Sequence, residues 1–165
     1  MKEPNLNAAD VHVVINDWEE QNRFIGEAKC YSSKGELRWK IPALCKGVGG
    51  PDPNVPSGDT PPGLYLAGEL IETQPSEPQA TWAAYGKYFI DLVEQEDQEN
   101  QRGRAGIGWH GGGTGAPDPL APLQPLLPTL GCVRSHNKDM EEYVVKTLQD
   151  VSHNGGKMWI TVNQL

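Results

Sequence analysis

Glycine and proline occur through this chain at a density that excludes most helical architectures. The 165 residues include 19 glycines and 14 prolines. Proline inside a helix or a central strand removes a backbone hydrogen bond, and glycine-proline clusters mark turns. Residues 46–63 are rich in both types, and residues 114–128 are rich in proline, so we expect both segments to be long loops. The composition predicts strands joined by turns, not a helix bundle.

Apolar residues alternate with polar ones in the N-terminal part, and this period of two indicates a β-hairpin. Residues 24–31 and 37–44 flank a turn that contains Lys34 and Gly35, which is the pattern of two half-buried antiparallel strands. Further strands are predicted at Val11–Ile15, Leu64–Glu72, Tyr85–Glu94, Gly106–His110 and Met158–Val162.

The hairpin register places two of the three cysteines. With the turn centred on Lys34 and Gly35, Cys30 faces Trp39 and Cys45 faces Phe24. Six positions of strand separate the two cysteines by roughly 20 Å, which is beyond the reach of a disulfide. We therefore interpret Cys30 and Cys45 as small buried apolar residues.

One convincing helix is predicted, at Asp139–Val151. Asp139 and Glu142 form an N-terminal capping pattern, and Gly155 with Gly156 supplies the end. Its apolar stripe consists of Met140, Tyr143, Val144, Leu148 and Val151. We expect a single mainly β domain over residues 1–165, in which residues 1–20 form an N-terminal strand and its lead-in, the sheets pack into a sandwich, and this helix follows the loop that contains Cys132.

The charge balance argues against nucleic acid as a partner. The formal net charge is −8 and the pI is about 4.9, whereas affinity for nucleic acid rests largely on lysine and arginine. The chain has no run of about 18 apolar residues that could span a bilayer, and residues 1–7 lack the apolar core of a secretory signal. We expect no membrane span and no export signal in this sequence.

A cysteine and a histidine among glycines are the strongest candidates for chemistry. Cys132 lies in the segment Thr129–Arg134, and His110 is followed by three glycines. A cysteine attacks carbonyl carbon as the thiolate, and a nearby histidine commonly takes its proton. His110 precedes Cys132, and it lies much closer than the roughly 50 residues of the caspase signature. The papain-like order, with cysteine first, is excluded too.

Other site types find no support in the pattern. The sequence has no pair of histidines four apart, no Cys-x-x-Cys and no acidic calcium loop, so we expect no metal. Walker and Rossmann glycine patterns are absent too, and we expect no cofactor. The glycines after His110 also suggest the oxyanion loop of lipases, but that interpretation requires a Gly-x-Ser-x-Gly nucleophile, which is missing.

The histidine-glycine pair and the segment Ser/Thr-x-Gly-Cys-(Ile/Val)-Arg together resemble the L,D-transpeptidase family of peptidoglycan enzymes. Thr129, Gly131, Cys132, Val133 and Arg134 fall on that pattern, and residues 59–65 resemble the Thr-Pro-x-Gly-x-aromatic segment that precedes the site in the family. The resemblance covers roughly residues 20 to 140. It implies an L,D-transpeptidase-like β-sandwich.

The resemblance also implies a mechanism. Cys132 would attack the carbonyl that joins the L-centre of diaminopimelate to a terminal D-alanine in a peptidoglycan stem peptide, and His110 would act as base. The Gly111 carbonyl would orient the imidazole, and N–H groups near Gly131 and Cys132 would form the oxyanion hole. Transfer to an amine gives a cross-link, whereas transfer to water makes the enzyme an L,D-carboxypeptidase.

Two other functions remain open. Thr129-Leu130 before a cysteine resembles sortases, although sortases carry the histidine further upstream and the arginine further downstream. A non-catalytic wall-binding protein that has kept the fold is the second. The family implies the periplasm or the cell wall as the location, which conflicts with the absence of an export signal. The oligomeric state and the acyl acceptor do not follow from the sequence.

Three further residues are expected to bind substrate. Arg134 lies two residues after the nucleophile, so in an extended chain its guanidinium reaches the same side and could grip a stem-peptide carboxylate. The alternative is a structural salt bridge to an acid such as Asp139. Thr129 and Trp109 are assigned to the substrate site as well. The proline-rich loop 114–128 should form an ordered wall or lid beside Cys132, the alternative being a surface connection away from it.

Overall fold

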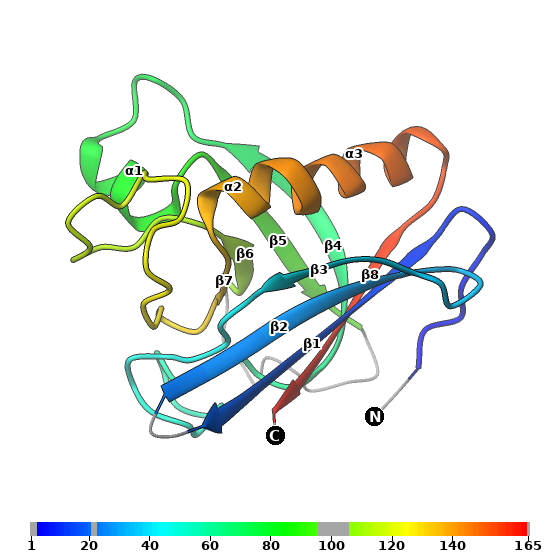
Figure 1. The fold of residues 1–165 in the computed structure, drawn as a ribbon, viewed down its shortest axis with the longest axis horizontal. Coiled ribbons are helices and arrows are strands. Elements are labelled where there is room, and N and C mark those ends of the chain that lie inside the picture. Colours follow the sequence, from blue (N-terminus) through cyan, green and yellow to red (C-terminus); the bar gives the residue numbers. More distant parts are fainter. Residues whose placement is uncertain (1–2, 21–22, 96–105, 165) are drawn as a thin grey trace.

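A single curled sheet of eight strands organises the molecule (Figure 1). The computed structural model describes residues 3–20, 23–95 and 106–164. The strand order across the sheet is β3-β2-β1-β8-β4-β5-β6-β7. The strands are β1 (Val11–Glu20), β2 (Arg23–Ser32), β3 (Leu37–Pro42), β4 (Gly63–Glu72), β5 (Tyr88–Glu94), β6 (Gly108–His110), β7 (Val133–Arg134) and β8 (Met158–Gln164).

Strand β1 lies at the centre of the hydrophobic core. It pairs with β2 in antiparallel fashion and with β8 in parallel fashion, and Val13 stands opposite both Cys30 and Ile160. Val11, Val13 and Ile15 are completely buried, as the period of two in the sequence predicts. Because a slip of one residue would turn this apolar row to the other face, its burial fixes the register.

A helix of 17 residues near the C-terminus lies across the sheet (Figure 1). It comprises α2 (Asn137–Asp139), the wider π-helical segment η1 (Met140–Val145) and α3 (Lys146–His153). The predicted helix is therefore confirmed, although it begins before Asp139, which provides no side-chain cap. Four residues of the predicted stripe are buried and belong to the core: Met140, Val144, Leu148 and Val151. Tyr143 is 38% exposed.

The mainly β class is confirmed, but a single curled sheet takes the place of the predicted sandwich of packed sheets. The pairings of strand β8 explain why the strands form one sheet. It pairs with β1 on one side and with β4 on the other, so it joins the N-terminal hairpin to the strands that carry the candidate site. These pairings connect distant parts of the chain, and the period of one strand does not reveal its neighbours.

Two local predictions differ from the structure between the strands. Residues 79–85 form the helix α1 (Gln79–Tyr85), and Gly86 ends it with φ +70°. Tyr85, predicted to begin a strand, therefore belongs to the helix, and β5 begins at Tyr88. Cys45 was expected opposite Phe24, but β3 ends at Pro42. Ala43 still donates to the Gly26 carbonyl of β2 at 3.0 Å, but the chain then leaves β2 and Leu44 pairs with Arg134 instead.

The predicted pairing of Cys30 and the interpretation of Cys30 and Cys45 as buried thiols are confirmed. Cys30 pairs with Trp39 across β2 and β3, and Cys30 and Cys45 are buried thiols that form no disulfide. Within the described ranges, no helix has the length and apolar character needed to cross a membrane.

Candidate active site

The pairing of β6 with β7 brings the histidine and the cysteine to one face of the sheet. Trp109 lies opposite Val133 and His110 opposite Arg134 in this parallel pair. Because side chains alternate along a strand, the same register extended by one residue puts Cys132 on the face of His110 and Arg134. In this register Cys132 and His110 are offset by two positions along the strand direction, at about 3.3 Å per position, and the paired backbones lie about 4.8 Å apart. Their Cα atoms are therefore separated by roughly 8 Å. The side chains of Cys132 and His110 therefore project from the same face of the sheet at neighbouring positions.

The Cys132 thiol makes hydrogen bonds with the backbone of the chain leading into β6. The Gly108 N–H donates to Sγ at 3.3 Å, and Sγ lies 3.4 Å from the Gly106 carbonyl oxygen. The Gly108 N–H stabilises negative charge on the sulfur, whereas the Gly106 carbonyl accepts the thiol proton and stabilises the neutral form. The residue is 8% exposed, so only a small part of it faces solvent.

The turn before Cys132 is held by the Thr129 hydroxyl. Thr129 Oγ1 donates to the Cys132 carbonyl oxygen at 2.8 Å and accepts the Gly131 N–H at 2.9 Å. Gly131 has φ +120°, a backbone conformation that a residue with a side chain rarely adopts. The structure therefore gives Thr129 a part in shaping the turn. The Gly131 N–H, assigned above to the oxyanion hole, is engaged by Thr129 in this conformation.

His110 is a buried imidazole with one fixed orientation. Its Nδ1 lies 2.7 Å from the Gly111 carbonyl oxygen, and the residue is 2% exposed. A carbonyl oxygen only accepts, so Nδ1 carries the proton and Nε2 keeps its lone pair. Burial lowers the pKa of His110 from 6.5 to about 4, with a further contribution from the positive charge of Arg134. The imidazole is therefore neutral at pH 7, which is the form that can accept a proton.

Two aromatic rings surround the imidazole, and the sequence analysis did not assign either of them to the site. Phe89 stacks on His110 with ring centroids 5.7 Å apart, and Tyr85 meets the imidazole edge to face at 5.0 Å. A Cβ atom at Gly108 would overlap the Phe89 ring, so glycine is needed there. The strand pattern places Phe89 on a face of β5, but only the pairing of Phe89 with His110 reveals the contact.

The guanidinium of Arg134 is bound by backbone carbonyls. Arg134 is 4% exposed. Nε donates to Gly111 at 3.3 Å, Nη1 to Leu127 at 2.7 Å and to Pro128 at 3.4 Å, and Nη2 to Ala84 at 3.1 Å. Asp139 takes none of these donors. We therefore assign Arg134 to support of the site, and its proposed grip on a substrate carboxylate stays a prediction.

Burial and the nearby thiol act on the Arg134 guanidinium in opposite directions. Burial lowers the pKa of Arg134, whereas negative charge on Cys132 raises it. The second effect means that the cation and a Cys132 thiolate stabilise each other, since electrostatic coupling is reciprocal. Arg134 thus favours the reactive form of the cysteine without contacting a ligand.

Trp109 lies on the core face of β6. It is completely buried, and its indole N–H donates to Ser135 Oγ at 2.9 Å. In this structure Trp109 packs the sheet behind the site and has no surface through which a substrate could reach it.

The loop 114–128 is attached to the segment that follows the nucleophile. Gln124 Nε2 donates to the carbonyls of Gly112 and Ser135 at 3.0 and 3.2 Å. Asn137 Nδ2 donates to those of Pro119 and Ala121 at 2.9 and 2.8 Å. Together with the bonds from Arg134, these contacts attach the loop to residues 134–137. Its role as a wall or lid beside Cys132 stays a prediction.

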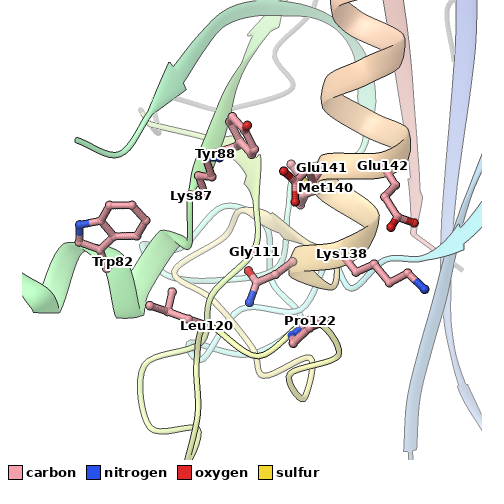
Figure 2. A pocket seen from close by; sticks show the side chains of 11 residues that line it. Trp82, Lys87, Tyr88, Gly111, Leu120, Pro122, Lys138, Met140, Glu141 and Glu142 are labelled. Carbon is pink, nitrogen blue, oxygen red and sulfur yellow. The ribbon is translucent and has the colours of Figure 1, made fainter. Parts of the chain in front are cut away.

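A cavity of about 630 Å³ lies on the other side of the Gly111 backbone, between α1 and the start of the long helix (Figure 2). Trp82, Tyr88 and Met140 are among its apolar and aromatic lining residues, and Lys138 and Glu142 are among its charged ones. Tyr88 and Phe89 alternate along β5, so the cavity and the Cys132-His110 face are on opposite sides of the sheet.

Comparison with family models, with curated proteins and with solved structures finds no match. Among residues 3–20, 23–95 and 106–164, no three His, Cys, Asp or Glu side chains gather in an arrangement that could hold a metal ion. The expectation that the protein uses no metal or cofactor stays a prediction.

The pKa of His110 predicts acid sensitivity. The folded value of about 4 lies below the ordinary 6.5, so the unfolded chain binds a proton more readily. We expect the free energy of unfolding to be unaffected by this residue above pH 6.5 and to fall by about 3 kcal/mol between pH 6.5 and pH 4. Urea titrations across this range should show the loss in the native protein but not in His110→Asn, which keeps a donor near Nδ1. Parallel profiles for the two proteins would refute the assignment.

The Thr129 hydroxyl predicts a second, smaller effect. Thr129→Val keeps the shape but leaves the buried Gly131 N–H without its acceptor, so we expect a loss of about 1 to 3 kcal/mol in unfolding free energy. Thr129→Ser retains the hydroxyl and is the matched control. Equal stability of the two variants in urea would show that the hydrogen bonds of Thr129 are unimportant.

Proposed function

We propose that this protein is a cysteine acyltransferase of the L,D-transpeptidase kind, and that its curled sheet is the sheet of that family. The observation that carries the proposal is the β6-β7 register, which directs the Cys132 thiol and the neutral His110 imidazole to the same face of the sheet. Support comes from the Gly111 carbonyl, which leaves Nε2 as the proton acceptor. The stem peptide of peptidoglycan is the substrate that the sequence resemblance implies.

The proposed reaction begins with proton transfer from the Cys132 thiol to His110 Nε2. Sγ forms a bond to the carbonyl carbon, the carbon-nitrogen bond to D-alanine breaks, and His110 returns the proton to the leaving amine. The resulting thioester then passes its acyl group to a diaminopimelate amine or to water. The neutral state of His110 supports its part as the first proton acceptor.

The decisive experiment uses disaccharide-tetrapeptide as substrate. Mass spectrometry should detect D-alanine release together with either a cross-linked dimer or a tripeptide product. A dimer identifies a transpeptidase, and a tripeptide alone identifies an L,D-carboxypeptidase. A transient adduct on Cys132 is expected in both cases. A stoichiometric complex without D-alanine release would contradict the enzyme proposal.

A second candidate function is binding to the cell wall without catalysis. The cavity between α1 and the long helix favours it, because aromatic residues beside charges of both signs suit a glycopeptide. If the protein only binds the cell wall, the Cys132→Ala variant should bind muropeptide as tightly as the native protein does. A reactive thiol would then not be needed. Under either function, the periplasm or the cell wall is the proposed location.

A further inference from the structure

The segment that carries Cys132 is paired along its length with residues 44–48. Leu44 and Arg134 exchange two backbone hydrogen bonds, of 2.8 and 2.9 Å. The Thr129 N–H donates to the Lys46 carbonyl at 2.9 Å, and the Val48 N–H donates to the Thr129 carbonyl at 2.8 Å. The position of residues 44–48 therefore fixes the position of Thr129, whose hydroxyl in turn holds the turn at Cys132.

Residues 46 and 47 are held from the opposite side by one buried carboxylate. Asp59 Oδ1 accepts the Gly47 N–H at 2.9 Å, and Oδ2 accepts from Lys46 Nζ at 3.2 Å. Asp59 is 2% exposed. The neighbouring backbone follows the same path, since the Thr60 N–H donates to the Cys45 carbonyl at 2.9 Å.

We propose that Asp59 is a positioning residue for the nucleophile, acting through Lys46, Gly47 and Thr129 on the turn that presents Cys132. The inference deepens the proposed function and rests on it only in taking Cys132 as the reactive residue. Every step of the path is a hydrogen bond of 2.8 to 3.2 Å between named atoms.

The buried charged cluster of Lys46, Asp59 and Asp17 is costly for the stability of the fold. Lys46 lies between Asp59 and Asp17, whose Oδ2 is 3.6 Å from Nζ, and Asp17 is 1% exposed. Burial raises the pKa of Asp17, so the fold opposes the charged form of this group. Removing charges from water costs free energy that an ion pair recovers only with good geometry. A role in holding residues 46 and 47 against the segment that carries Cys132 would explain why these charges are buried despite the desolvation cost.

The test compares Asp59→Asn with Asp52→Asn. Asp52 is an exposed carboxylate in the same loop that also accepts a backbone N–H, from Asn54 at 2.9 Å, and so it is a matched control. Amide hydrogen exchange is followed by NMR at Thr129 and Gly131, and Val13 in the core of β1 reports global unfolding. In Asp59→Asn we expect exchange at Thr129 and Gly131 to accelerate about tenfold relative to Val13. Asp52→Asn should leave the ratio unchanged.

Kinetics on the tetrapeptide then separate positioning from binding. We expect kcat for D-alanine release to fall about tenfold in Asp59→Asn, while KM stays within about twofold, since Asp59 contacts no substrate. If this variant does not fold, Asp59→Glu, which keeps the charge and displaces the carboxylate, is measured in the same way. An unchanged exchange ratio overturns the inference. Faster exchange in a protein whose parent releases no D-alanine supports the positioning role and refutes the proposed function.

Discussion

Replacement of Cys132 by alanine should abolish D-alanine release from the tetrapeptide substrate, with kcat falling by a factor on the order of 10⁴ or more. Alanine removes the atom that forms the thioester, and nothing else in the described part of the face can take its place. The fold should remain intact, because Cys132 is not a member of the hydrophobic core cluster. Circular dichroism and urea unfolding of the variant provide that control.

The other two cysteines supply matched controls for the same measurement. Burial raises the pKa of Cys30 to about 12, and burial also raises that of Cys45 well above its ordinary value. Both thiols are thus poor nucleophiles, and we expect Cys30→Ala and Cys45→Ala to retain turnover in the folded protein. Alkylation with iodoacetamide followed by peptide mass spectrometry should modify Cys132 first. Loss of turnover in a folded Cys30→Ala that matches the loss in Cys132→Ala would overturn the assignment of the nucleophile.

The strands could be predicted where the pattern of buried and exposed residues is visible within a short stretch of sequence. In β1 the buried residues alternate, so Val11, Val13 and Ile15 identify both the strand and its inner face. The long helix follows from its apolar stripe for the same reason. The closure of all strands into one sheet depends on β8 pairing with β1 and β4, and no pattern within a single strand encodes the identity of its partners.

The residues of the candidate site likewise fall into those that a local motif reveals and those that depend on partners distant in sequence. The sequence motif places His110 and Cys132 in the site. In the structure His110 ends β6, and Cys132 directly precedes the neighbouring strand β7. Phe89 and Asp59 were missed because each acts through a partner that is distant in sequence, on His110 in one case and on Gly47 in the other. Arg134 was assigned by residue type, since arginine suits a carboxylate, but its partners in the fold are carbonyl oxygens, which every residue carries.

The partners of Arg134 predict a large effect on stability. Arg134→Met leaves the carbonyl oxygens of Gly111, Leu127, Pro128 and Ala84 without this donor. The Gly111 carbonyl keeps His110 Nδ1 as a donor and Pro128 is exposed, so the loss falls mainly on the carbonyls of Leu127 and Ala84. Each of these costs about 1 to 3 kcal/mol when water cannot replace the donor. We expect the free energy of unfolding to fall by about 3 kcal/mol or more, measured by urea titration, whereas Arg38→Met, at an exposed position of β3, should change it by less than about 0.5 kcal/mol.

Arg134→Lys separates this internal role from a grip on substrate. Lysine keeps the charge but lacks the planar fork, and one ammonium cannot reach carbonyls that lie on three sides of the guanidinium. We therefore expect the lysine variant to be destabilised by about 1 to 3 kcal/mol, and to show a lower kcat because the loop before Cys132 loses its attachment at Leu127. A lysine variant with wild-type stability and a KM for tetrapeptide raised about tenfold would instead place the guanidinium on a substrate carboxylate, since only a residue that binds the ligand alters affinity without altering the fold.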